Sequence, residues 1–175
     1  SWGFRGIWGH EGKIMLLVDG APHNDAAWGN LIFGRRFPVE LIARIEVIRG
    51  PGAAKFGNYA EMAVVRITTV NEDLEGGFTD INIRNMENHF SGAEFTGAYG
   101  ETLASGFDYS VSAHVKNVRR TFTDFSSADG TLRTDQKHSP MDLLYLDGNI
   151  RYSYFNLSTL LEQFSFEHQE SLLQL

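Results

Sequence analysis

The chain has 175 residues, enough for a domain with a sizeable core, and carries a formal net charge of -7. The acidic balance argues against nucleic acid as a partner, and the absence of cysteine excludes disulfides, thiolate metal sites and cysteine nucleophiles. No apolar run reaches the length of a membrane-spanning helix. This does not exclude strands that cross a membrane in a β-barrel, because such strands alternate apolar and polar residues and have a hydrophilic average.

The first 36 residues contain one clear strand between two irregular segments. Residues 1–12 place aromatic side chains among glycines, which predicts irregular backbone with a strand element. Residues 13–18, KIMLLV, predict a buried strand that ends at the turn pair Asp19-Gly20. Residues 21–36 have no sustained period but hold several aromatic residues, so we predict a long structured loop.

Residues 37–70 predict a short helix followed by two strands. Pro38 suits the first helical turn, and Glu40 follows where the helix dipole favours an anion. Residues 45–49 predict a strand that Gly50-Pro51-Gly52 ends, and residues 64–70 predict a second, β-branched strand. The Gly-Pro-Gly segment lacks the Gly-Lys-Ser/Thr ending of a phosphate-binding loop, so nucleotide binding is not expected.

From residue 71 a polar hinge gives way to alternation of apolar and polar residues with a period of two. In residues 107–116, for example, an apolar face from Phe107 to Val115 opposes a polar face from Asp108 to Lys116. Short connections at one end and a long polar one, residues 117–141, at the other are typical of a membrane barrel. We predict strands over residues 79–85, 93–99, 107–116, 144–154 and 156–167.

Three motifs resemble the plug domain of TonB-dependent outer-membrane receptors. The first is Gly3-Phe4-Arg5-Gly6, and the second is the run from Leu16 through Asp19-Gly20 to Asn24-Asp25. The third extends from Ile45 through Arg49-Gly50-Pro51-Gly52 to Phe56-Gly57, before a β-branched strand. Their order makes the resemblance specific, although Met62 and Ala63 stand where the family has a glycine pair.

The resemblance implies the C-terminal half of a plug domain over residues 1–70 and the first barrel strands over residues 71–175. The expected fold class is therefore an α+β plug portion followed by antiparallel strands of an incomplete transmembrane β-barrel. The predicted strands cannot close a barrel of this family, which needs roughly 22. An open sheet edge in lipid would leave unpaired backbone groups, so we expect the chain to be a fragment of a longer receptor.

The resemblance also implies a function: active uptake of a scarce nutrient such as an iron–siderophore, haem, cobalamin or a glycan, across the outer membrane of a Gram-negative cell. The expected partners are a TonB-type energy-coupling protein in the periplasm, a small nutrient ligand that could be a metal chelate, and outer-membrane lipid. No catalytic constellation and no paired-histidine metal spacing is present in the sequence. We expect neither enzymatic activity nor a cofactor.

Two sets of residues are candidate functional sites. By the resemblance, Arg5 and Arg49 hold the plug against the barrel wall through bidentate pairs with carboxylates. Glu46, in the same strand as Arg49, is a further candidate for this network. The alternative is that these are ordinary strand-end residues without a latch role. Ligand-contact candidates lie in loops expected to face the ligand: His23, Asn24, Asp25, Trp28, Asn58 and Tyr59. Their alternative is a structural role in turns and caps.

Two readings of the alternating strands remain open. The first is the receptor described above, in which Tyr99, Tyr109, Tyr152 and Tyr154 form an interface girdle. The second is a soluble α+β binding or interaction module, whose tyrosines are core aromatics. The apolar face separates them, because a soluble sheet would bury that face under a second sheet or a helix.

Overall fold

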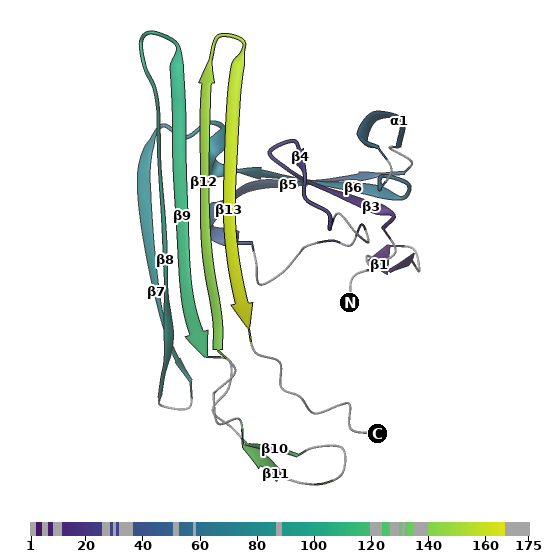
Figure 1. Ribbon diagram of the computed structural model, residues 1–175, viewed down its shortest axis with the longest axis vertical. Coiled ribbons are helices and arrows are strands. Elements are labelled where there is room, and N and C mark those ends of the chain that lie inside the picture. The colour runs from purple at the N-terminus through teal and green to yellow at the C-terminus, as the bar shows by residue number, and fades with distance from the viewer. Residues whose placement is uncertain are drawn as a thin grey trace. The chain divides into compact units, whose positions relative to one another are not determined.

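The computed structural model describes residues 3–4, 7–8, 12–25, 29, 31, 37–50, 53–57, 59–86, 89–119, 124–126, 130, 132–134 and 140–166. The chain divides into two compact units, Ser1–Leu74 and Glu75–Leu175. Each unit is built around its own β-sheet (Figure 1). The boundary expected at residue 70 falls inside the first unit.

The first unit contains a mixed sheet in the order β4-β3-β6-β5. Its strands are β3 (Ile14–Val18), β4 (Ala21–Pro22), β5 (Ile42–Arg49) and β6 (Ala63–Thr69). All residues of β3 are buried, which confirms the buried strand predicted from the apolar run, and β3 runs parallel to β6. β5 pairs antiparallel with β6 at the edge of the sheet and is largely exposed.

The turn after β3 is fixed by its two residues and by a bond to β6. Asp19 has φ 46° and Gly20 has φ 82°, the left-handed region that tight two-residue hairpin turns require. The Asp19 carboxylate accepts hydrogen bonds from the Thr69 amide and hydroxyl, both at 2.7 Å. This carboxylate therefore ties the ends of the two parallel strands together.

Short elements complete the first unit. β1 (Gly3–Phe4) pairs with β2 (Ile7–Trp8), in the segment predicted to hold a strand element. The predicted helix after Pro38 is a single 3-10 turn, Val39–Leu41, with Pro38 at its N-cap and Glu40 in its first turn. A second 3-10 turn, Val70–Glu72, occupies the expected hinge, and the short helix α1 (Ala53–Phe56) was not predicted.

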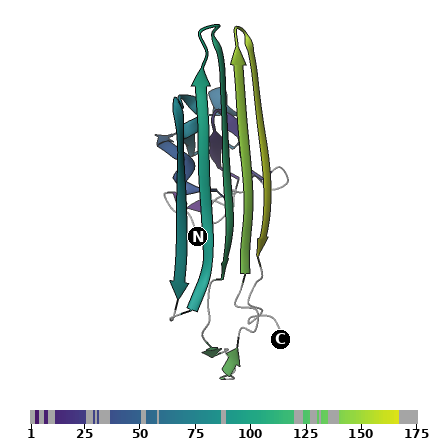
Figure 2. The same ribbon diagram turned by 90° about the vertical axis from the view of Figure 1, so that its left-hand side faces the viewer.

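The second unit is an antiparallel sheet in the order β13-β12-β9-β8-β7. Its long strands lie side by side in sequence order (Figures 1 and 2). The long connection holds a small hairpin of β10 (Asp124–Ser126) and β11 (Leu132–Thr134). The main strands are β7 (Gly76–Met86), β8 (His89–Thr102), β9 (Phe107–Arg119), β12 (Pro140–Tyr152) and β13 (Phe155–Phe166).

All five predicted strands of this unit are confirmed, and most extend further than predicted. One predicted end is wrong: the fourth strand stops at Tyr152, two residues before the expected Tyr154. Ser153 takes φ 55°, and together with Tyr154 it makes the hairpin turn. A positive φ is uncommon for residues such as serine. Because Ser-Tyr is not one of the usual turn pairs, the sequence carries no strong turn signal here.

Candidate functional site

The Asn24 side chain substitutes for a strand partner along one edge of β3. Its Oδ1 accepts a hydrogen bond from the Leu16 amide at 2.8 Å. Its Nδ2 donates to the Ile14 carbonyl at 2.8 Å and to the Gly29 carbonyl at 2.9 Å. The amide group is thus fully engaged with backbone, a structural role of the kind that Asn commonly takes in loops.

Gly29 brings two of the candidate ligand-contact segments together. Its amide donates to the Asp25 carbonyl at 2.8 Å, and its φ of +65° lies in the left-handed region. A Cβ added at this position would overlap the Tyr59 ring, so the ring lies directly against the Gly29 backbone. Asn24 and Asp25 therefore surround a single glycine together with Tyr59, which is distant from them in sequence.

The other ligand-contact candidates are placed differently. The His23 ring lies edge-on to Phe37, with the ring centroids 6.5 Å apart. His23, Asn24, Asp25 and Tyr59 are all partly buried. Trp28 and Asn58 lie outside the described residues.

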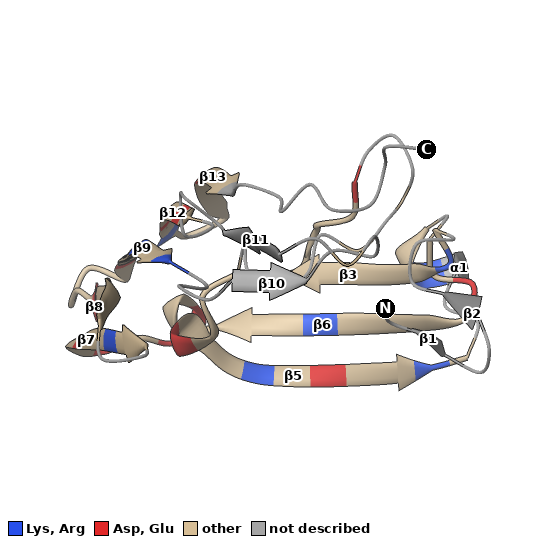
Figure 3. Cartoon of the chain, turned by 90° about the horizontal axis from the view of Figure 1, so that it is seen from below, with Lys and Arg blue, Asp and Glu red and all other residues tan. Residues whose placement is uncertain are grey.

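Two of the three latch candidates, Glu46 and Arg49, lie on the exposed edge strand β5. Glu46 is flanked by Arg66 of β6, with Nη1 to Oε2 at 3.4 Å, and by Arg44, with Nε to Oε2 at 3.6 Å. Charges of both signs therefore line this edge (Figure 3). Arg49 ends the strand, is exposed, and makes no ion pair within the described part of the chain. Arg5 lies outside the described residues.

On the central strands of the second unit's sheet, polar side chains are buried on one side, together with Leu143 and Tyr145, and apolar side chains are exposed on the other. On β9, Ser110, Ser112 and His114 are at most 5% exposed, whereas Val111 and Val115 are 52% and 47% exposed. A sheet in a water-soluble core has the opposite arrangement. We call these two sides the polar face and the apolar face. The exposed large side chains of the apolar face include Ile81, Ile83, Phe95, Tyr99, Val111, Val115, Leu146, Ile150, Leu157 and Leu161.

A charged cluster on the polar face connects three neighbouring strands. The Glu94 carboxylate of β8 is 3% exposed and lies 2.6 Å from Arg84 Nε of β7 and 3.3 Å from Lys116 Nζ of β9. The next residue on this face, Thr96, shares a 2.8 Å hydrogen bond between its Oγ1 and Nδ1 of the buried His114. Sequence analysis missed this cluster, because only the strand register places Lys116 opposite Glu94 and His114 opposite Thr96. Arg84 lies diagonally from Glu94, two residues along β7 from its direct partner.

Aromatic side chains gather on the apolar face at its short-turn end. Tyr99, Phe107, Tyr109 and Tyr152 form a chain of tilted ring contacts with centroids 6.1–6.3 Å apart. The hydroxyls of Tyr99 and Tyr109 both donate to Glu101 Oε2, at 3.1 and 3.2 Å. Three of the four tyrosines predicted to form a girdle thus share one end of the face, and Tyr154 lies in the turn beyond it.

Within the described residues, no group of three or more His, Asp or Glu side chains is arranged to hold a metal ion. No helix in this part of the chain is long and apolar enough to cross a membrane.

Comparisons with known proteins agree with this arrangement. Residues 1–64 match the family model of the TonB-dependent receptor plug domain. The vitamin B12 transporter BtuB of Vibrio vulnificus is 32% identical over 113 residues, which is 62% of this chain and 18% of that protein.

Two solved structures share the fold at low sequence identity. The siderophore receptor PirA of Acinetobacter baumannii superposes with a TM-score of 0.61 at 18% identity. The match covers 90% of this chain and 25% of the PirA chain. A mutant form of the ferric enterobactin receptor PfeA of Pseudomonas aeruginosa superposes with a TM-score of 0.56 at 22% identity. The match covers 87% of this chain and 25% of the PfeA chain. The chain therefore spans a quarter or less of the length of each of these proteins, and its sheet matches part of a barrel wall.

Proposed function

We propose that this chain belongs to the TonB-dependent receptors and is the part of a nutrient-uptake receptor that contains the end of the plug and the start of the barrel. In this proposal residues 1–70 belong to the plug and residues 71–175 to the barrel. One observation carries it: a plug-family match over residues 1–64 is followed, in the same chain, by a sheet that exposes its apolar face. An exposed apolar face of this kind is favourable where it meets lipid.

The proposed location is the outer membrane of a Gram-negative cell. The apolar face would lie against lipid, with its aromatic end at the membrane–water interface, where Tyr side chains are enriched. The polar face, with Glu94, Thr96 and His114, would line the inside of the barrel. The soluble-module alternative would need a cover for the apolar face, and within the described residues exposed side chains such as Ile81 and Val111 have none.

The proposed mechanism is binding followed by energised release. A nutrient would contact the outer loops and the plug loops that carry His23, Asn24, Asp25, Trp28, Asn58 and Tyr59. A TonB-type partner in the periplasm would then pull on the plug and open a path. This process needs no covalent step, and the named relatives are a transporter and receptors rather than enzymes.

Arg5 and Arg49 are proposed to latch the plug to carboxylates of the barrel wall. Arg49 suits this role because it is exposed and makes no ion pair within the described part of the chain. Glu46 is a weaker candidate, since Arg66 and Arg44 already flank it. Arg49→Ala should raise the ion conductance of the full receptor in planar bilayers, while Arg44→Ala on the same strand should not; equal conductance in both variants would refute the latch.

The uptake function is tested in cells that carry the full-length gene. Cobalamin is the first nutrient to test, because the relative at 32% identity is a vitamin B12 transporter, and ferric siderophores are the second. We expect deletion of the gene to abolish high-affinity uptake of one of these, and loss of the TonB-type partner to have the same effect. Uptake that continues unchanged without the energy-coupling partner would overturn the proposal.

A further inference from the structure

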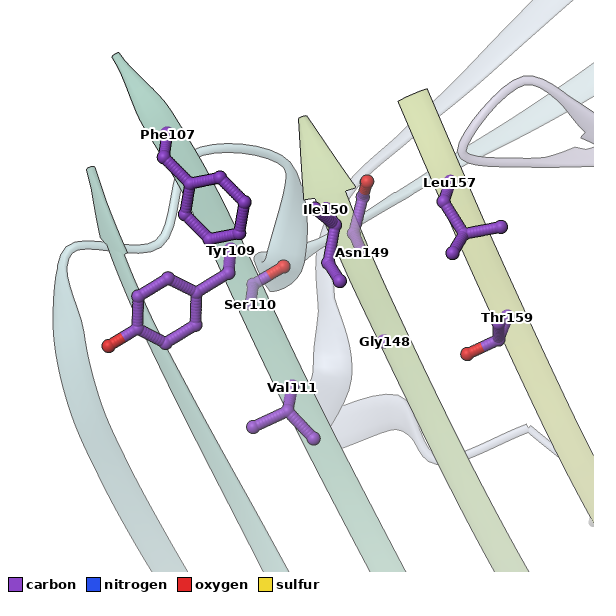
Figure 4. Close-up of a pocket in the computed structure, with 9 residues that line it drawn as sticks. All are labelled: Phe107, Tyr109, Ser110, Val111, Gly148, Asn149, Ile150, Leu157 and Thr159. Atoms are coloured by element: carbon purple, nitrogen blue, oxygen red, sulfur yellow. The ribbon is translucent and has the colours of Figure 1, made fainter. Parts of the chain in front are cut away.

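The apolar face of the second unit contains a hollow of about 510 Å³ centred on Gly148. Figure 4 shows its lining: Phe107, Tyr109 and Val111 from β9, Ile150 from β12, and Leu157 and Thr159 from β13. Ser110 and Asn149 belong to the polar face, so they contribute mainly backbone. Among these side chains of the apolar face, none carries a charge.

Strand register explains why the hollow lies at this point. Gly148 of β12 pairs directly with Val111 of β9 on one side and with Thr159 of β13 on the other. The next row toward the short turns is filled by Tyr109, Ile150 and Leu157, and the row on the opposite side by Ala113, Leu146 and Leu161. The missing side chain at Gly148 leaves a gap whose lining extends from this row through the row of Tyr109, Ile150 and Leu157 to Phe107.

The backbone does not require glycine at position 148. Its φ is not positive, unlike that of Gly92 or Gly106. A Cβ here would lie 3.4 Å from Thr159 Oγ1 and 3.9 Å from the Ser110 carbonyl oxygen, which are ordinary contact distances. A Cβ is therefore accommodated at this position, and the open volume is not a by-product of a strained turn.

The depth of the hollow matches one leaflet of a bilayer. Gly148 precedes Tyr152 of the aromatic end by four residues, which is about 14 Å along a strand. With a strand tilt of roughly 40°, this places the hollow about 10 Å below the interface, within the ~15 Å that one leaflet contributes to the hydrocarbon core. An acyl chain whose headgroup lies at the aromatic end would pass directly over it.

We propose that this hollow is a binding site for an acyl chain of a glycerophospholipid in the leaflet on the short-turn side. The inference rests on the proposed function, because the hollow is continuous with the face that meets lipid in that proposal. An acyl chain fits its chemistry, since the lining side chains offer aliphatic and aromatic contact without a charged partner. The hydroxyls of Tyr99 and Tyr109 and the carboxylate of Glu101 lie at the end where the headgroup would be.

The test uses the full-length receptor in vesicles of palmitoyl-oleoyl phosphatidylethanolamine that contain a trace of the same lipid with a diazirine in one acyl chain. Photolabelled residues are located by mass spectrometry of peptides. Gly148→Leu fills the hollow, and Thr159→Leu fills it from the neighbouring strand if the first variant fails to fold. The matched control is Ala93→Leu, which adds the same side chain on the apolar face outside the hollow.

We expect labelling of β9, β12 and β13 around Gly148 to fall about tenfold in the filled variants, the change expected from losing contact with roughly two methylene groups. The control should label like the wild type. Equal labelling in all variants would overturn the inference, as would preferential labelling by a lipid A probe or a cross-link between two receptor copies at this face. A wild-type receptor that fails to insert into vesicles would instead refute the proposed function.

Discussion

Gly29 is the residue on which the candidate ligand loop depends, for two separable reasons. Its φ of +65° penalises any side chain, and a Cβ would also overlap the Tyr59 ring. Gly20 has a similar φ of +82° but open space where its Cβ would be. The two glycines therefore allow the backbone penalty to be separated from the contact with Tyr59.

Gly29→Ala should destabilise the first unit more than Gly20→Ala. The backbone term alone costs about 1–2 kcal/mol at each site, and only Gly29 adds the overlap with Tyr59. The measurement is urea-dependent proteolysis of the full receptor, with cleavage within residues 12–69 followed by mass spectrometry. The double variant Gly29→Ala/Tyr59→Ala should lose less stability than the sum of the two single variants, because removing the ring removes the overlap. A double-mutant cycle measures this coupling. Additive effects would show that ring and glycine do not touch.

Asn24 offers a second prediction at this scale, because its amide both accepts and donates. Asn24→Asp keeps an acceptor for the Leu16 amide but turns a carboxylate oxygen toward the carbonyls of Ile14 and Gly29. We expect this near-isosteric change to lower the free energy of unfolding by about 1–3 kcal/mol, at least as much as Asn24→Ala, because it places a carboxylate oxygen against two carbonyl oxygens. The same proteolysis assay measures both variants. A fully stable Asn24→Asp receptor with weakened nutrient binding would instead assign Asn24 to the ligand site.

At the scale of elements, Glu94 adds a side-chain link between β7 and the rest of the sheet, beside the backbone pairing of β7 with β8. Its carboxylate is buried and shared by Arg84 of β7 and Lys116 of β9, so one side chain connects three strands. Removing its charge leaves both cations without this partner. Because Arg84 is half exposed, water will compensate part of the loss.

Glu94→Gln should loosen β7 selectively. We expect the free energy of local opening to fall by about 1–3 kcal/mol, the range for hydrogen bonds to charged groups. Amide hydrogen exchange of the whole receptor should show faster exchange in β7 and little change in β12. Glu101→Gln, which alters a carboxylate at the exposed end of the same strand, is the control. Uniform acceleration across all strands would contradict a local role.

The order of the elements could be predicted from sequence, whereas the contacts between them could not. The continuous apolar run in KIMLLV and the alternation of apolar and polar residues in β9 are each visible along a single strand. The Asn24 bonds, the Glu94 cluster and the Gly148 hollow depend on which residues of different strands lie opposite one another. That register is set by pairing across the whole sheet, so no local pattern in the sequence reports it.

The helix α1 and the turn at Ser153 show a different limit. α1 spans only Ala53–Phe56, too short for a helical period to be visible. Ser153 and Tyr154 replace the usual Asn-Gly turn pair, and the close pairing of Tyr152 with Phe155 fixes the turn instead. Here pairing of the long strands determines the local backbone, so a tyrosine that looks like part of a strand becomes part of a turn.

For the whole molecule, the inversion of the second unit's sheet is the property with the widest consequence. A charged side chain placed on the apolar face of a membrane strand costs about 2–4 kcal/mol for Arg at the bilayer midplane, and far less near the interfaces. The same substitution on the polar face meets water and polar groups. The apolar and polar faces should therefore respond in opposite ways to one substitution at the same depth.

Leu160 and Leu161 of β13 make this comparison with adjacent residues of the same type. Leu161 pairs with Leu146 on the apolar face, and Leu160 pairs with Asp147 on the polar face; they are 55% and 44% exposed. Leu161→Arg should reduce the folded receptor recovered from outer membranes by more than tenfold at equal expression, since about 2–4 kcal/mol is lost. Leu160→Arg should be tolerated, because its guanidinium can pair with Asp147. The assay is heat-modifiable gel mobility of the membrane fraction. If both variants fold equally well, lipid does not contact the apolar face, and the assignment of residues 71–175 to a barrel wall fails with it.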